Sequence, residues 1–434
     1  MKRRWSAALA AGAVLALLAV CALLLRPQNA APAQEEITFS GERDVLRAEF
    51  VYDEGLRALS GTQRMTLTNR TGEDLEEIVL RLYMNAQAGG SAAVSGVSVD
   101  GAKAKYAQDE EDASVLRIAA HWPAGCTVDL SFTLMIRHGK TDGAAIVTLP
   151  QLAMREDGDW RTDAFDGLAA RSYAQAFDYV VRVNGEIAAQ MEHARDASLA
   201  ILPGGKTRTA QAGGVRLTAL AASRAEAQRL LAAGKEALSQ LEALGFPCPF
   251  AALTLAAAGT ERADGIALSG LIAVRADADQ KALLRRVTRL AAQQTFGIDV
   301  ESDPWNAPWL SESIASALEM LACRRKEGQA VYEARLFEEM EIAARVTRPY
   351  GVTVGAGTAH FGGDAEMTQV LRDQGGAMLL GIEQAVGEET FLQALRLYAQ
   401  RCGEGIASQA DFEAALAEAS GSSWSGYLRD ELTY

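Results

Sequence analysis

The chain has 434 residues, which is longer than one hydrophobic core commonly supports, so at least two domains are expected. Its composition is that of a folded protein, with 49% hydrophobic and 23% charged residues. The net charge of -14 argues against a nucleic-acid partner, which would require a basic surface to neutralise phosphates.

The N-terminus has the pattern of a membrane anchor. The sequence "MKRR" precedes an uncharged, mostly apolar stretch from Trp5 to Leu25. About 20 apolar residues cross the hydrocarbon core of a bilayer, and flanking basic residues stay on the cytoplasmic side. We therefore predict a signal anchor or transmembrane helix and linker over residues 1–34. This anchor places a single-pass protein in the cell membrane with its C-terminal bulk extracytoplasmic. The alternative is a signal peptide cleaved near "QNAAPAQ", which leaves a secreted protein.

Residues 35–210 carry the alternating pattern of β-strands. In "GTQRMTLTN", Met65 and Leu67 fall on one face of the predicted strand. The runs "EEIVLRLYMN", "TVDLSFTLMI" and "FDYVVRVNG" are also strand-like, and turn sequences such as "TGED" and "EDGDW" separate them. Alternation with a period of two is typical of half-buried antiparallel strands. We therefore predict an antiparallel β-sandwich or saddle that forms one domain.

Residues 211–434 change to a helical periodicity. Ser223 followed by Glu226 is a capping-box pattern, and Gly245 is suited to end the helix that follows. The short apolar runs "AALTLAAAG" and "GLIAV" are predicted strands. The fold class predicted for the whole chain is α+β, with a β-rich domain followed by a mainly helical one. The other predicted helices are 279–296, 309–327, 330–345, 367–386, 388–400 and 409–420.

The five cysteines are distributed singly along the chain. Cys21 lies in the apolar N-terminal stretch, and the others are Cys126, Cys248, Cys323 and Cys402. No two of them have the C-x-x-C spacing of a metal or redox site. Their spacing leaves open both free thiols and one or two disulfides.

The segment "VTRLAAQQTFGIDVESDPWNAPWLSESIASALEM" has the spacing of a zinc-peptidase helix pair but contains no histidine. Thermolysin-like peptidases place two histidines four residues apart on one helix, with a glutamate between them as general base. In the membrane alanyl aminopeptidase family, a third ligand follows in a W-L-N-E-G-F-A motif, separated by eighteen residues from the second histidine. The run "PWLSESIASALEM" resembles that motif. Glu312 then stands at the ligand position and Gln293 at the position of the second histidine.

Other segments resemble the same family in the same order, from Glu49 to Leu432. The run "ALSGTQRMTLTNRTGEDLEEIVLRLYMNA" resembles the N-terminal saddle domain of the family. The run "ADGIALSGLIAV" resembles an exopeptidase strand whose glutamate holds the α-amine of the substrate, with Ala267 at that position. The run beginning "LRDQGGAMLLG" resembles a segment whose tyrosine steadies the tetrahedral intermediate, with Asp373 at that position. The resemblance implies a thermolysin-like peptidase domain over residues 211–434.

The residues at the family's His-Glu-x-x-His positions do not suit zinc chemistry. Arg289 stands at the first histidine, and its permanent positive charge would repel a divalent metal. We expect Arg289 to form an ion pair with Glu312 instead. Leu290 removes the general base, and Gln293 offers only a weak carbonyl oxygen as a ligand.

The positions that would contact substrate are changed as well. Ala267 removes the amine anchor, and Asp373 places an acceptor where an oxyanion needs a donor. The chain has four histidines, of which three fall in the strand-rich half and are interpreted as surface or core residues. His360 falls in a glycine-rich loop near the expected cleft, but one histidine and Glu312 make poor zinc coordination.

The resemblance and these losses together predict an aminopeptidase-like protein without catalysis and without a cofactor. Such a protein would keep the fold for binding a peptide or protein partner and would contact the membrane through its N-terminal helix. Two alternatives remain open. One is a divergent zinc metallo-aminopeptidase that cleaves N-terminal residues from peptides, and the other is a structural domain whose cleft has filled in.

Overall fold

A computed structural model describes residues 37–87, 89–163, 173–260, 265–276, 279–341 and 352–433. Contacts divide the chain into Met1–Ser40 and one compact unit, Gly41–Tyr434, which is described below. The predicted anchor over residues 1–34 lies outside the described residues. Within the described ranges, no helix combines the length and the apolar character needed to span a bilayer.

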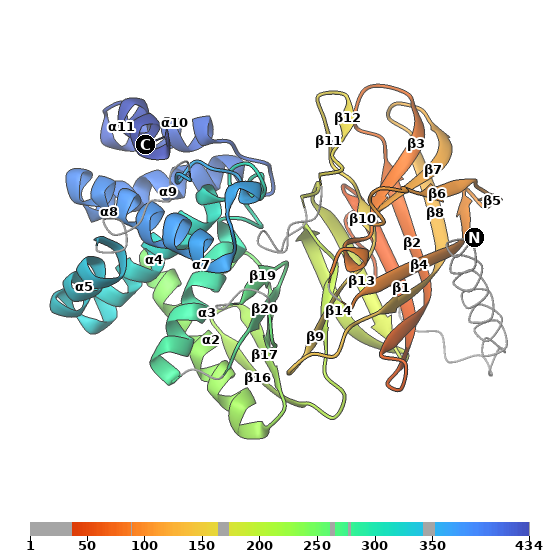
Figure 1. The fold of residues 1–434 in the computed structure, drawn as a ribbon, viewed down its shortest axis with the longest axis horizontal. Helices are drawn as coiled ribbons and strands as arrows, with labels where there is room; N and C mark the ends of the chain where they lie inside the picture. The colour runs from red at the N-terminus through yellow and green to blue at the C-terminus, as the bar shows by residue number, and fades with distance from the viewer. Residues whose placement is uncertain are drawn as a thin grey trace, which may run out of the picture. The chain divides into compact units, whose positions relative to one another are not determined.

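The first half of the compact unit is built on a seven-stranded sheet with the strand order β14-β13-β1-β2-β8-β4-β5 (Figure 1). The pairs β1–β2, β2–β8 and β4–β8 are antiparallel, as predicted, whereas β1 and β13 run parallel. The chain reaches β13 only after it has built a second sheet, so no tight hairpin constrains the direction of β13. The strands are β1 (Asp44–Asp53), β2 (Ala58–Thr68), β4 (Ser91–Val99), β5 (Ala102–Lys103), β8 (Thr127–Arg137), β13 (Phe177–Val183) and β14 (Glu186–Ala194).

A four-stranded sheet with the order β10-β3-β7-β6 shares the hydrophobic core of the seven-stranded sheet. Met65 and Leu67 of β2 are buried on one face, as the alternation predicts, and they join Ile78 and Leu80 of β3 in that core. Two layers of sheet around a common core make the β-rich half of the predicted α+β fold. The strands are β3 (Leu75–Arg81), β6 (Tyr106–Gln108), β7 (Val115–Trp122) and β10 (Gln151–Leu152).

A five-stranded sheet, ordered β16-β17-β18-β20-β19, opens the second half. Helices α2 and α3 contact its strands and lie along one face of it in Figure 1. The predicted caps of α2 are confirmed, because Ser223 accepts a hydrogen bond from the backbone of Glu226 and Gly245 is left-handed with φ of 94°. The bounds are β16 (Lys206–Ala212), β17 (Val215–Ala221), α2 (Arg224–Leu244), β18 (Ala252–Ala257), β19 (Ile266–Leu268), β20 (Leu271–Val274) and α3 (Gln280–Thr295).

Helix α4 (Trp309–Glu327) is the central helix of the second half, and every residue from Trp309 to Cys323 is buried. It contacts α2, α3, α5, α8 and the segment η4 (Thr368–Gln374). A helix that is buried on all sides must satisfy each of its polar side chains inside the protein. The other helices are α5 (Gln329–Arg335), α7 (Asp364–Met367), α8 (Gly375–Val386), α9 (Glu388–Cys402), α10 (Gln409–Ser420) and α11 (Ser425–Thr433).

The predicted helices 330–345 and 367–386 are not continuous α-helices in the described residues. α5 continues into the π-helical segment η2 (Leu336–Glu341), and η4 (Thr368–Gln374) is a π-helical segment between α7 and α8. π-helical turns are rare and occur mostly as short segments within helices, often at functional sites. The periodicity of apolar residues in the sequence does not distinguish a short π-helical segment from an α-helix, so the sequence predicts continuous helices.

Two buried polar side chains join the β-rich half to the turn between β19 and β20. Ser269 Oγ accepts hydrogen bonds from the backbone N–H groups of Arg195, at 2.9 Å, and Asp196, at 3.2 Å. The same hydroxyl donates to Asp196 Oδ2 at 3.0 Å. The guanidinium of Arg195 donates to four backbone carbonyls in the segments around Ala174, Asp299 and Gly405. One short polar segment therefore fixes the position of several distant loops.

We predict that Ser269→Ala destabilises the protein by about 1–3 kcal/mol, because two buried N–H groups lose their acceptor. Urea denaturation of the purified protein measures this loss. The exposed Ser423, whose hydroxyl contacts only that of Ser425 among the described residues, provides the control. Ser423→Ala is expected to change the free energy of unfolding by less than about 0.5 kcal/mol. Equal effects of the two substitutions would contradict the prediction.

Candidate functional site

Helices α3 and α4 carry four of the six positions that the sequence assigns to the site. The N-terminus of α3 is capped by Asp279, whose Oδ1 accepts from the backbone of Lys281 and Ala282 at 2.8 and 2.9 Å. The remaining residues of α3 bring Leu290 and Gln293 into the core, where they are 1% and 2% exposed.

Glu312 stands in the first turn of α4 and is buried, with 3% of its surface exposed. Its Oε2 lies 3.4 Å from Nε of Arg372, whose side chain is equally inaccessible. Arg372 belongs to η4, one residue before Asp373. The residue at the ligand position of the motif therefore forms a buried ion pair with a residue from another helix.

Two serines of α4 hold the backbone that carries Arg372. Ser313 Oγ donates to the carbonyl of Leu371 at 2.7 Å, and Ser316 Oγ donates to the carbonyl of Arg372 at 2.9 Å. Helix α4 also packs closely against Gly375, the first residue of α8, because a Cβ added there would lie 2.1 Å from Ser313 Oγ. The hydroxyl groups next to Glu312 thus position η4 so that the Arg372 side chain reaches the carboxylate.

Apolar, buried side chains occupy the positions that the resemblance assigns to the general base and to the amine anchor. Leu290 and Ala267 belong to the same hydrophobic core, and each is 1% exposed. At Gly265, an added Cβ would lie 3.1 Å from Leu290 Cδ1, so the side chain of Leu290 closely approaches the strand that carries Ala267. Neither residue offers a proton acceptor to a substrate or a water molecule.

The last two predicted positions are partly buried. Arg289 lies on α3, and Asp373 lies on η4 beside Arg372. The partner of Glu312 that the structure identifies is Arg372, which the sequence reasoning missed. The expected contact between Arg289 and Glu312 stays a prediction.

His360 is exposed, and its Nδ1 lies 3.3 Å from the carbonyl of Gly357. Among the described residues, no group of three or more His, Cys, Asp or Glu side chains is arranged to hold a metal ion. The four cysteines from Cys126 to Cys402 are free thiols.

The architecture is that of known peptidases. The chain aligns with the crystal structure of an M1 zinc metallopeptidase from Deinococcus radiodurans with a TM-score of 0.61 and 17% identity, over 90% of this chain and 92% of that one. It also aligns with a two-domain M1 zinc metallopeptidase variant bound to the amino acid L-tryptophan, with a TM-score of 0.60 and 18% identity, over 91% of this chain and 95% of that one. No protein-family model and no curated protein matches the chain.

The chain has the M1 zinc metallopeptidase fold. This result confirms the resemblance inferred from the motifs at the level of the fold.

Zinc is the metal that this fold implies, and the residues at the M1-like site do not fit it. Structural and catalytic zinc ions are held by histidine, cysteine and carboxylate ligands. Here Glu312 is paired with the buried guanidinium of Arg372, and Gln293, which the resemblance aligns with the second histidine, carries an amide. Arginine has no lone pair for a metal and carries a charge that repels one. We therefore derive no catalytic step through a metal ion.

Replacing Arg372 with methionine should destabilise the protein by about 3–5 kcal/mol, because the carboxylate of Glu312 stays buried without this cation. The double variant Glu312→Leu/Arg372→Met should recover much of this loss, since it removes both buried charges. Chemical denaturation of both variants measures the difference.

The exposed pair of Arg401 and Glu418 is the control for this experiment. Arg401→Met should cost less than about 1 kcal/mol, as for surface ion pairs generally. If Arg372→Met were no more destabilising than Arg401→Met, Glu312 would not depend on Arg372.

Proposed function

We propose that this protein is a non-catalytic relative of the M1 peptidases that binds a peptide or protein partner outside the cytoplasm. The observation that carries the proposal is the buried ion pair of Glu312 with Arg372. In this arrangement the carboxylate of Glu312, at the expected metal-ligand position, neutralises the charge of Arg372.

The remaining positions support the loss of catalysis independently. Peptide hydrolysis needs a base to activate water and a donor to stabilise the oxyanion. Leu290 is a buried hydrocarbon side chain, and Asp373 is an acceptor. Ala267 has no charge to hold a substrate amine. Restoring activity would require a replacement for each of these groups.

The N-terminal segment supports the proposed location. The basic residues of "MKRR" and the uncharged stretch from Trp5 to Leu25 suit a single-pass anchor. We propose that this anchor holds residues 35–434 at the outer face of the cell membrane, where the M1-like fold meets its partner.

The second candidate function is a divergent zinc aminopeptidase. It is favoured by one observation, the position of Glu312 in the first turn of α4, next to the helix that carries Gln293. This candidate requires Arg372 to leave Glu312 and other residues to supply the missing ligands.

We predict that the purified full-length protein releases no 4-nitroaniline from aminoacyl 4-nitroanilides, with or without added zinc, because the base and the metal ligands are missing. Absorbance assays across a panel of amino acids test this prediction. Glu312→Gln serves as the matched control, since it removes the retained ligand position, and its background should equal that of the wild type. Chelator-sensitive release that disappears in Glu312→Gln, while circular dichroism shows that this variant is still folded, would establish the zinc aminopeptidase instead.

A further inference from the structure

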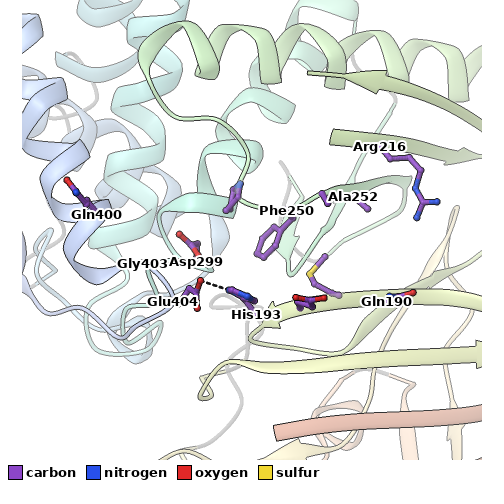
Figure 2. Close-up of a pocket in the computed structure, with 13 residues that line it drawn as sticks. Gln190, His193, Arg216, Phe250, Ala252, Asp299, Gln400, Gly403 and Glu404 are labelled. Atoms are coloured by element: carbon purple, nitrogen blue, oxygen red, sulfur yellow. Dashed lines mark ion pairs between the residues drawn. The ribbon is translucent and has the colours of Figure 1, made fainter. Parts of the chain in front are cut away.

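An open cavity of about 890 Å³ lies apart from the six M1-like positions, none of which lines it. Its walls come from the end of β14, the first residues of β17 and β18, and the loop that follows α9. Figure 2 shows Asp299, Glu404 and His193 close together, with Arg216 toward the other end of the cavity and Phe250 between them. The volume is within the range of small-molecule and peptide sites.

The charges that line the cavity are mainly negative. Glu192, Asp299 and Glu404 contribute three carboxylates, whereas Arg216 contributes the single guanidinium. Glu404 is already engaged, because its Oε1 lies 2.7 Å from His193 Nδ1 and its Oε2 lies 3.4 Å from Arg43. Within the described ranges, neither Asp299 nor Glu192 forms a salt bridge, although the charges of Arg195 and His193 act on Asp299 at longer range. These two carboxylates are therefore the ones available to a ligand.

His193 and Glu404 are held in an unusual backbone conformation. Their φ angles are 59° and 58°, in the left-handed region that non-glycine residues seldom adopt. Asp178 stabilises the backbone at His193, because its Oδ1 accepts hydrogen bonds from the His193 N–H at 3.1 Å and from Arg43 Nε at 2.9 Å. Such strain persists only where the surroundings impose it, and it concentrates at binding and catalytic sites.

Asp299 is the partly buried carboxylate of the cavity. An added Cβ at Gly403 would lie 3.4 Å from Asp299 Oδ2, so the chain passes close to this side chain without covering it. Desolvation by burial raises the pKa of Asp299 above its usual value, although a hydrogen bond from the backbone of Glu404 opposes the shift. A cation bound beside Asp299 would replace the lost hydration.

The middle of the cavity is apolar. Phe250 and Met191 line it, and the Met191 side chain packs against Gly270, where an added Cβ would lie only 1.8 Å from Met191 Cε. Cys248 is adjacent in sequence, but burial raises the pKa of its thiol to about 11, so it remains a neutral thiol rather than a nucleophile. The cavity therefore combines carboxylates with a small apolar area, because Phe250 and Met191 are largely buried and expose only 6% and 9% of their surface.

We propose that this cavity binds an organic cation, with the ammonium group at Asp299, the hydrocarbon part toward Phe250 and Met191, and Glu192 adding to the negative potential of the lining. An ammonium group forms a charge-assisted hydrogen bond with a carboxylate. Arg216 lies toward the other end and does not contact the cation. The inference concerns a different site from Glu312, so it holds whether or not the protein is a peptidase.

Titration calorimetry of the full-length protein with phenethylamine tests the proposal, with phenylacetate as the anion of similar shape. We expect saturable binding of phenethylamine and none of phenylacetate. Asp299→Asn should weaken phenethylamine binding about tenfold, as expected for loss of a charged hydrogen bond. A blocked dipeptide of phenylalanine and lysine, titrated in parallel, distinguishes a peptide side chain from a free amine as the source of the cation.

Two further variants keep the result interpretable. Glu192→Gln changes an exposed residue, so it should fold normally and weaken phenethylamine binding even if Asp299→Asn is unstable. Arg216→Ala, also at an exposed position, should leave binding unchanged or strengthen it. The proposal is wrong if neither cationic probe binds the folded wild type, if phenylacetate binds equally well, or if Arg216→Ala abolishes binding while Glu192→Gln does not weaken it.

Discussion

The buried ion pair between Glu312 and Arg372 is the constraint around which the helical half is arranged. Helix α4 is surrounded by other elements, so each polar side chain on it needs a partner within the protein. Arg372 meets this need for Glu312, and the carbonyls of Leu371 and Arg372 meet it for Ser313 and Ser316. Removing either member of such a pair is costly, although the pair itself contributes little net stability.

The same principle applies further along α4. Glu319 accepts two hydrogen bonds from the guanidinium of Arg335, at 2.9 and 3.0 Å, and Arg335 also donates to Glu339 of η2. Arg372 within η4 and Arg335 directly before η2 therefore each reach an acidic side chain of α4. Helix α4 is thus a core helix in which the two buried carboxylates, Glu312 and Glu319, are each matched by a buried arginine.

Much of the fold follows from local sequence signals. Ser223, Asp279 and Gly245 mark helix ends, because helix capping depends on residues that are close together in sequence. The predicted helices 309–327 and 409–420 have the same bounds as α4 and α10. The β-rich half is likewise visible in the alternation around Met65 and Leu67.

The missed features depend on contacts between distant segments. The π-helical turn of η4 brings Arg372 to Glu312 across 60 residues, and no local pattern in the sequence indicates this contact. The parallel pairing of β1 with β13 also joins segments far apart in the chain. His193 was interpreted as a surface or core residue, because no local pattern indicates its ion pair with Glu404 at the cavity.

The most direct test of the central claim is a crystal structure of the protein grown with zinc, with data recorded on both sides of the zinc absorption edge. We predict no anomalous peak at Glu312 and a contact between its carboxylate and the guanidinium of Arg372. A fully occupied zinc ion bound by Glu312, with Arg372 displaced, would contradict a non-catalytic M1-fold protein.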